Sequence, residues 1–546
     1  MSERLSSAAK IGAVGVLLAC ALGWEASASG QGAPAGRSAR VAASSSPDFF
    51  FPIGDKTLFL ASTEETGVEP WASDATAEGT RLLMDLCPGP CAARAFYPFA
   101  RVGRQLFFGV VSHAGRSELW ATAGTPETTR RLSDGPGRPG GGYSYPAWTE
   151  FGGRLYYSWR DPMQGNELWS SDGTPTGTRR VIDLRPGPRS SDPGDLVPFG
   201  GRLWFSANDG EHGRSIYRSD GTARGTERIA VPARGQAGGI HALSGKLVFS
   251  TGGVSQTLWS LSSNTVSPEK LFDLVPSFGP FSSYQRVVHR GKLLFAGRPA
   301  GSSRGLWATD GTVAGTRRIY AFKNNVRSLA LLPYGGSEFG DRYLFQLFRG
   351  DRAAPDGAVR KIELWATDGT SAGTGRIADL CRGECFEHNS WILADGPRAH
   401  IVMGSIGPTE IWSTDGTADG TRQIAKGLVA PLGSAGPDFY FSRVSRGTNT
   451  GPRLDVWASD GTVEGTRPVT RPPVSPVLDF VWGAGPAQGK LLFAGYDELH
   501  GIELWVSDGT EEGTHLLLDL DPSERSRRDP SVVLDRRSRA ASRQSF

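Results

Sequence analysis

Two pairs of cysteines are the residues of this chain whose type and spacing most directly suggest chemistry. Cys87 and Cys91, and Cys381 and Cys385, are each separated by three residues and occupy equivalent places in a repeated unit, where the link to the next unit is expected to start. These four are the cysteines that remain once Cys20, near the N-terminus, is set aside, and their even count and equivalent placement predict two local disulfides in an oxidising compartment. A zinc site needs four ligands, whereas each pair supplies two and has no paired histidine nearby. We therefore expect no metal site and no cofactor.

Motifs for catalysis are absent from the sequence. It contains no H-E-x-x-H, G-x-S-x-G, P-loop or EF-hand string. Its eight histidines, among them His212, His289 and His400, are scattered rather than clustered. We therefore predict no catalytic residues and expect that the chain is not an enzyme, although aspartate and glutamate pairs suited to glycosidase chemistry could meet in a central channel.

A motif of the form Glu-Leu-Trp-x-x-Asp-Gly-Thr recurs along the chain, as in residues 167–174, 363–370 and 503–510. Self-similarity at such a period indicates a repeat architecture. The aromatic anchor occurs ten times, at spacings from 42 to 58 residues: Trp71, Trp120, Trp169, Tyr217, Trp259, Trp307, Trp365, Trp412, Trp457 and Trp505. An aspartate stands three residues later in eight copies: Asp74, Asp172, Asp220, Asp310, Asp368, Asp415, Asp460 and Asp508.

Each unit divides into four strand-like pieces with short, Gly-rich links between them. One unit reads as strands over residues 195–199, 202–206, 215–218 and 228–231. Three hairpins followed by one longer link are the connections of a β-propeller blade. We predict an all-β protein, a β-propeller of about ten four-stranded antiparallel blades, as one large ring or as two five-bladed rings. A β-solenoid is the alternative, but its repeats are commonly shorter.

The motif residues have structural roles in this interpretation. The Trp belongs to the core, and its burial contributes about 2–3 kcal/mol per blade. Asp172 is expected to accept a backbone N–H two residues on, and Gly173 and Gly177 to adopt positive φ without steric cost. A calcium site is disfavoured, because each copy offers one acid where calcium takes six to eight oxygens.

The recurring motif resembles that of the ELWxxDGT repeat proteins, a group of exported bacterial proteins common in myxobacteria. The resemblance covers about residues 48–523. It implies an exported repeat protein and brings no catalytic residues with it. The second and fifth copies depart from the pattern, at Ala123 and at residues 262–264, and we expect those blades to be irregular.

The ends of the chain predict export. Residues 1–28 have a basic start, a short apolar run and the small residues of a signal-peptidase site, Ala26-Ser27-Ala28. A competing interpretation is a lipobox in which Cys20 becomes a lipid anchor. Residues 29–47 are expected to form a flexible linker and residues 524–546 an Arg-rich tail. Either way we expect a secreted or cell-envelope protein with no transmembrane segment in the mature chain.

The amino-acid composition excludes several classes of protein. With 73 Gly, 36 Pro, 21% charged residues and a net charge of +3, the chain is not a disordered, collagenous or polytopic membrane protein, and nothing favours nucleic-acid binding. We predict an exported non-enzymatic scaffold that binds an extracellular protein or glycan through its face of variable loops, including the insertion at residues 349–361. The alternative is a propeller-type extracellular hydrolase or lyase acting on glycans.

Overall fold

The computed structural model describes most of the repeat region. The described residues are 41–42, 45–89, 95–111, 117–133, 138–139, 148–161, 163–231, 236–252, 256–263, 265, 267–275, 286–299, 304–322, 326–331, 336–350, 359–385, 390–394, 396–404, 409–427, 429–446, 452–470, 475–476, 484–497, 499–522 and 524–525. The predicted signal peptide, Cys20 and Cys91 lie outside the described residues.

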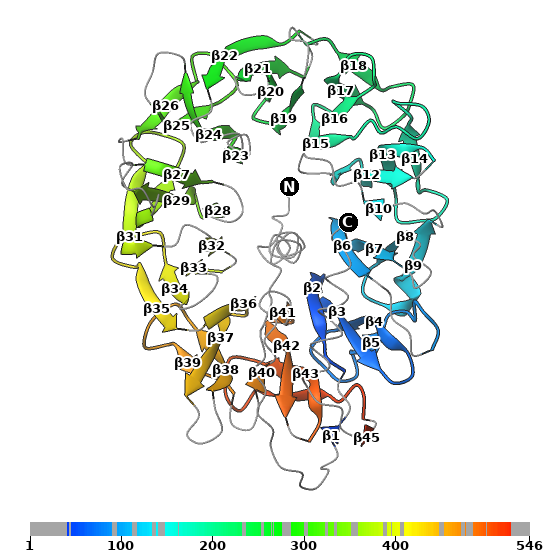
Figure 1. Cartoon of the computed structure of the whole chain (residues 1–546), viewed down its shortest axis with the longest axis vertical. Coiled ribbons are helices and arrows are strands. Elements are labelled where there is room, and N and C mark those ends of the chain that lie inside the picture. The colour runs from blue at the N-terminus through cyan, green and yellow to red at the C-terminus, as the bar shows by residue number, and fades with distance from the viewer. Residues whose placement is uncertain are drawn as a thin grey trace, which may run out of the picture. The chain divides into compact units, whose positions relative to one another are not determined.

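Ten antiparallel blades follow one another along the chain, and we number them 1 to 10 (Figure 1); blades 5 and 6 are joined by strand pairing into one eight-stranded sheet. Blade 1 contains β2 (Asp48–Ile53), β3 (Lys56–Thr63), β4 (Gly67–Ser73) and β5 (Arg81–Leu82). Blade 2 contains β6 (Ala95–Val102), β7 (Gln105–Val111), β8 (Ser117–Thr122) and β9 (Arg130–Ser133). Blade 3 contains β11 (Trp148–Phe151), β12 (Arg154–Asp161), β13 (Gly165–Ser171) and β14 (Arg179–Ile182). Blade 4 contains β15 (Gly194–Phe199), β16 (Arg202–Asn208), β17 (Arg214–Ser219) and β18 (Glu227–Ile229). Blade 5 contains β19 (Ala237–Ala242), β20 (Lys246–Gly252), β21 (Gln256–Ser262) and β22 (Glu269–Val275).

The remaining five blades repeat the same strand order. Blade 6 contains β23 (Arg286–His289), β24 (Lys292–Pro299), β25 (Gly305–Thr309) and β26 (Arg317–Ala321). Blade 7 contains β28 (Gly336–Phe339), β29 (Arg342–Gly350), β30 (Val359–Thr367) and β31 (Gly375–Cys385). Blade 8 contains β32 (Ser390–Leu393), β33 (Ala399–Met403), β34 (Thr409–Thr414) and β35 (Arg422–Gly427). Blade 9 contains β36 (Val429–Ala435), β37 (Asp438–Arg446), β38 (Pro452–Ser459) and β39 (Arg467–Pro468). Blade 10 contains β41 (Ala484–Ala487), β42 (Lys490–Asp497), β43 (Gly501–Ser507) and β44 (His515–Leu518).

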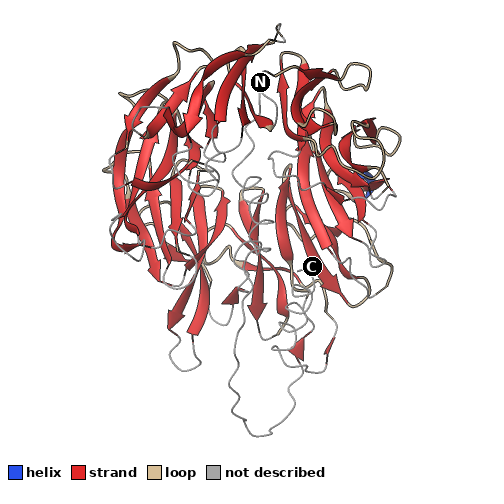
Figure 2. Cartoon of the chain, turned by 45° about the horizontal axis from the view of Figure 1, so that its top comes forward, coloured by secondary structure: helices blue, strands red, loops and turns tan. Residues whose placement is uncertain are grey.

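A few short elements add to this pattern. β10 (Arg138–Pro139), β27 (Val326–Ala330) and β40 (Ser475–Pro476) pair with the second strands of blades 3, 7 and 10 and extend their first strands. β1 (Val41–Ala42) pairs with β45 (Glu524–Arg525). Among the described residues the one helical element is a 3₁₀ turn at Pro126–Thr128, and Figure 2 shows strands almost throughout. No helix in this part of the chain is long and apolar enough to cross a membrane.

The blades group into two compact units, of which the smaller contains blades 9, 10 and 1 and the larger blades 2 to 8. Within the smaller unit, Phe59 of blade 1 and Leu504 of blade 10 share one core cluster. Within the larger unit, Val248 of blade 5 packs with Phe295 of blade 6. The series therefore has no break after the fifth blade, and its last blade packs on its first. The predicted fold class, an all-β ten-bladed β-propeller, is confirmed, and the alternative of two five-bladed rings is wrong.

The core of each blade is built around a cross-strand pair that includes the motif aromatic residue. Each anchor lies on the third strand, and its partner on the second strand is aromatic in nine blades and Ile401 in blade 8. In blade 7 the rings of Phe345 and Trp365 stack with centroids 6.3 Å apart. Trp120, Trp365 and Trp505 are buried and the other six motif Trp are half-buried. Direct pairing of large rings explains why the aromatic position recurs.

The motif aspartates organise the turn after the third strand, and six of the eight are exposed while Asp74 and Asp368 are half-buried. In blade 3, Oδ1 of Asp172 accepts hydrogen bonds from the backbone N–H of Thr174 at 2.9 Å and from its hydroxyl at 2.7 Å. The threonine hydroxyl bond holds the pKa of this carboxyl below its usual range. Gly173 has φ +83°, as predicted. The prediction for Gly177 is wrong, because Gly177 does not have positive φ. It must be glycine because a Cβ there would lie 2.0 Å from Oδ1 of Asp172.

Blade 2 shows how the turn forms without the aspartate. Ala123 replaces it, and Thr128 stands where the eight copies that have the aspartate carry the second glycine. Oγ1 of Thr128 accepts the backbone N–H of Ala123 at 3.1 Å and that of Thr125 at 3.3 Å. The hydroxyl thus accepts the N–H that the aspartate carboxylate accepts in the regular copies. Loss of the carboxylate removes the need for glycine, which explains why the two residues change together.

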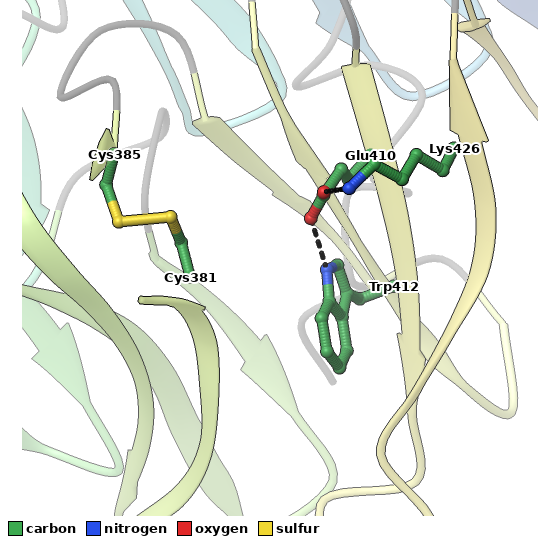
Figure 3. The surroundings of a disulfide bond; sticks show 5 residues. All are labelled: Cys381, Cys385, Glu410, Trp412 and Lys426. Atoms are coloured by element: carbon green, nitrogen blue, oxygen red, sulfur yellow. Dashed lines mark hydrogen bonds and ion pairs between the residues drawn. A yellow bond between two sulfur atoms is a disulfide. The ribbon is translucent and has the colours of Figure 1, made fainter. Parts of the chain in front are cut away.

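A disulfide joins Cys381 and Cys385 (Figure 3). The pair was expected at the start of the link between blades, but it lies inside β31, where Cys385 pairs with Val359. Cys385 packs into the core shared by blades 7 and 8, against which Trp412 of β34 also packs. Figure 3 also shows that Glu410 accepts a hydrogen bond from Nε1 of Trp412 and forms an ion pair with Lys426. Cys87 is disulfide-bonded as well.

Candidate functional site

The link between blades 3 and 4 is fixed by the motif glutamate of blade 3. Glu167, fully buried, accepts hydrogen bonds from the backbone N–H and hydroxyl of Ser191 at 2.9 and 2.6 Å and from the N–H of Leu184 at 3.1 Å. We call this arrangement, a motif glutamate bound to a link serine, the glutamate clamp. Glu503 of blade 10 makes the same three bonds, with Ser45 and Leu520. The N-terminal segment therefore takes the place of a link on blade 10.

The glutamate clamps make stability depend on pH. Burial raises the pKa of the clamp glutamates Glu167 and Glu503 from 4.5 to about 7, and it does the same for Glu69, the motif glutamate of blade 1, which binds Leu86 but no serine among the described residues. A carboxyl whose pKa is raised by folding stabilises the folded state fully below its unfolded pKa, and the contribution is lost as pH rises through about 7. We expect the Tm measured by calorimetry to fall by roughly a few degrees between about pH 5 and pH 8.

A glutamine variant tests this origin of the pH dependence. Glu503→Gln has the shape of the protonated side chain at every pH, so its Tm should fall less steeply than that of the native protein. The matched control is Glu410→Gln, which changes a motif glutamate that contacts Trp412 instead of a link. If the Tm fell equally steeply with pH in the native protein and in Glu503→Gln, the clamp would not be the cause of the pH dependence of stability.

Two aspartates follow the clamped serine at the entrance to blade 4. Asp192 is exposed, with Oδ1 accepting a hydrogen bond from Nδ2 of Asn166 at 3.0 Å. Asp195, on β15, is only 5% exposed. Both have left-handed backbones, with φ of 48° and 53°. Blade 1 has the same backbone conformation at Ser46 and Phe49. Blades 1 and 4 therefore share the left-handed backbone conformation at these two positions, and in blade 4 both positions carry a carboxylate.

Asp195 is held by hydrogen bonds from two strands, β16 of its own blade and β19 of blade 5. Its Oδ2 accepts hydrogen bonds from the hydroxyl of Ser206 at 2.9 Å and from the backbone N–H of Gly239 at 3.0 Å. Its other oxygen, Oδ1, makes no hydrogen bond to any described residue. Arg214 donates to Oγ of Ser206 at 2.9 Å and to the carbonyl oxygen of Asp192 at 3.0 Å. Burial raises the pKa of Asp195 despite these bonds.

A second guanidinium approaches the same place from blade 6. Arg286, at the start of β23, is 3% exposed and donates from Nη1 to the hydroxyl of Ser250 at 3.1 Å and from Nη2 to Gln256. Its charge acts on Asp195 and on His241. Desolvation and the charge of Arg286 lower the pKa of His241 to about 3, so this imidazole is neutral. Figure 1 shows β15, β19 and β23 along the inner side of the larger unit, so these groups gather on inner strands.

The two aspartates occupy contrasting environments, which is the arrangement that general acid–base chemistry requires. Asp195, buried and with a raised pKa, can hold a proton on its free oxygen. Asp192, exposed to water, can act as the second carboxylate. Glycoside hydrolysis uses one carboxyl as acid and a second as base or nucleophile. We therefore regard Asp192, Asp195 and the two arginines as the candidate active site.

The sequence did not predict this site. The predicted disulfides and the motif Trp and Asp residues have structural positions, and none contributes a side chain to it. Of the predicted variable-loop insertion, residues 351–358 lie outside the described residues. One sequence signal was available: residues 45–47 and 191–193 read Ser-Ser-Pro and Ser-Asp-Pro, so an acid replaces a neutral residue in otherwise similar links.

No family model matches the chain, and no curated protein matches its sequence. Among solved structures it is similar to a prolyl endopeptidase, with 13% identity, a TM-score of 0.38 and coverage of 63% of this chain and 53% of the other. It is also similar to oligopeptidase B from Leishmania major, with 9% identity, a TM-score of 0.36 and coverage of 66% and 52%. An oligogalacturonate lyase in complex with manganese has 13% identity, a TM-score of 0.29 and coverage of 70% and 98%.

These comparisons correct two predictions. Every one of these structures is that of an enzyme, which contradicts the prediction of a non-enzymatic scaffold and the prediction that the chain is not an enzyme. The chain spans about half the length of the two peptidases. At such low identity the likeness extends to the fold alone, so no substrate and no residue role is transferred from these proteins.

Proposed function

We propose that the chain is an exported propeller-type hydrolase that acts on extracellular glycans at the Asp192 and Asp195 site. The observation that carries the proposal is the pair of carboxylates in opposite environments, one buried with a raised pKa and one exposed. Asp195 protonates the leaving oxygen of the glycosidic bond, and Asp192 activates water or attacks the sugar. Arg214 orients both acids through Ser206 and the Asp192 carbonyl. The predicted signal peptide, residues 1–28, would bring the enzyme to such substrates.

The proposal is tested with the mature chain, residues 29–546, on a panel of neutral and acidic polysaccharides. Release of new reducing ends marks cleavage, and an unsaturated product absorbing in the ultraviolet would instead indicate a lyase. We expect cleavage of at least one glycan by the native protein and none by the Asp192→Asn/Asp195→Asn double variant. A native protein that cleaves no glycan, or a double variant as active as the native protein, would contradict the proposal.

A further inference from the structure

Arg286 differs from the other arginine buried in the described part of the chain. Arg349 is also buried, and its Nε lies 2.8 Å from Oε2 of Glu363. Arg286 has no carboxylate within 4.0 Å among the described residues, and it donates hydrogen bonds to the neutral side chains of Ser250 and Gln256. A buried guanidinium without a paired carboxylate carries a desolvation penalty of several kcal/mol. A ligand anion would offset that penalty.

The backbone beside Arg286 is shaped for close approach. Gly238 and Gly239 of β19 lie next to Asp195 and Arg286 respectively. A Cβ on Gly238 would lie 3.0 Å from Oδ2 of Asp195, and one on Gly239 would lie 3.1 Å from Nη1 of Arg286. Both glycines are half-buried. The absence of side chains at these two positions therefore keeps a methyl group away from both the acid and the guanidinium.

We propose that Arg286 binds an anionic substituent of the substrate, a carboxylate or a sulfate ester, so that the glycans cleaved at this site are acidic polysaccharides. This inference rests on the proposed function for the catalytic role of the neighbouring aspartates. The guanidinium offers its remaining N–H donors to two oxygens of the anion, which suits carboxylate and sulfate alike. The neutral Ser250 and Gln256 fix its orientation without neutralising its charge.

The test is a binding measurement that needs no turnover. The native protein is titrated calorimetrically with oligomers of dextran, carboxymethyl dextran and dextran sulfate, which share a backbone and differ in charge. We expect binding at least tenfold tighter to one or both anionic oligomers than to dextran, and the preferred oligomer identifies carboxylate or sulfate as the group. Equal affinity for all three would overturn the inference.

Variants at Arg286 assign the anion to this residue. Arg286→Met should remove the preference for the anionic oligomers while leaving the Tm unchanged or higher, because it removes a buried charge that has no carboxylate partner. Arg290→Met, which removes an exposed charge from the turn of the same blade, is the matched control and should keep the preference within twofold. Arg286→Lys retains the positive charge but lacks the planar guanidinium that can donate two parallel hydrogen bonds, so it should bind the anionic oligomers with intermediate affinity. A preference retained in Arg286→Met would overturn the inference, whereas anion binding without glycan cleavage would refute only the proposed function.

Discussion

Replacing Asp195 with asparagine is expected to lower kcat/KM for glycan cleavage by at least about 100-fold, the usual contribution of a positioned general acid. The amide has the size of the carboxyl, and asparagine tolerates the left-handed φ of 53° at this position. Its oxygen can still accept the hydrogen bonds from Ser206 and Gly239 that Oδ2 accepts. The variant therefore keeps the local structure and loses only the proton. Kinetics on the glycan identified in the screen would measure the effect.

Asp438→Asn is the matched control for this variant. Asp438 is also a buried aspartate, but it belongs to blade 9 and has an ion-pair partner, since Nη2 of Arg467 lies 2.8 Å from its Oδ2. We expect its activity to stay within twofold of the native value. Similar losses in both variants would show that Asp195 supports the fold and does no chemistry.

The pH dependence of the cleavage rate also tests whether Asp195 acts as the acid. An acid must be protonated to act, so the native rate should fall as pH rises through the raised pKa of Asp195. Asp195→Asn has no proton to lose at this position, so the falling limb should disappear from its residual activity. A falling limb of the same shape in the variant would assign the titration to another group.

The fold could be predicted from the sequence because its cause is local and repeated. Trp169, Asp172 and Gly173 lie within five residues, and the same short string returns in most units. The role of the motif glutamate could not be predicted from the motif. Glu167 stands beside the Leu-Trp pair, yet its partner Ser191 lies 24 residues further along. A hydrogen bond over that distance leaves no spacing signal within the motif.

The candidate site could not be predicted for a related reason. Asp195 comes from blade 4, Gly239 from blade 5 and Arg286 from blade 6. Each lies on the first strand of its blade, outside the recurring motif. Only the packing of successive blades brings them together. The burial that raises the pKa of Asp195 is likewise a property of packed neighbours, and no single repeat shows it.

The coupling between the motif aspartate and the second glycine predicts a large effect on stability. Gly177→Ala would place a methyl group where the carboxylate of Asp172 lies, 2.0 Å from Oδ1. Since Gly177 does not have positive φ, the expected cost comes from this overlap and not from backbone strain. Overpacking of this kind costs about 1–3 kcal/mol. Denaturant unfolding followed by tryptophan fluorescence would measure it.

The turn of blade 2 indicates a second substitution that should compensate for loss of the motif aspartate in blade 3. Asp172→Ala alone should cost about 1–2 kcal/mol, because the N–H of Thr174 loses its acceptor. In blade 2 the hydroxyl of Thr128 accepts the corresponding N–H, beside Ala123. The double variant Asp172→Ala/Gly177→Thr recreates that pair in blade 3. We expect it to be more stable than the sum of the two single changes predicts, by at least about 1 kcal/mol. Strict additivity of Asp172→Ala and Gly177→Thr would contradict the proposed exchange, because the threonine would then not be replacing the carboxylate as acceptor.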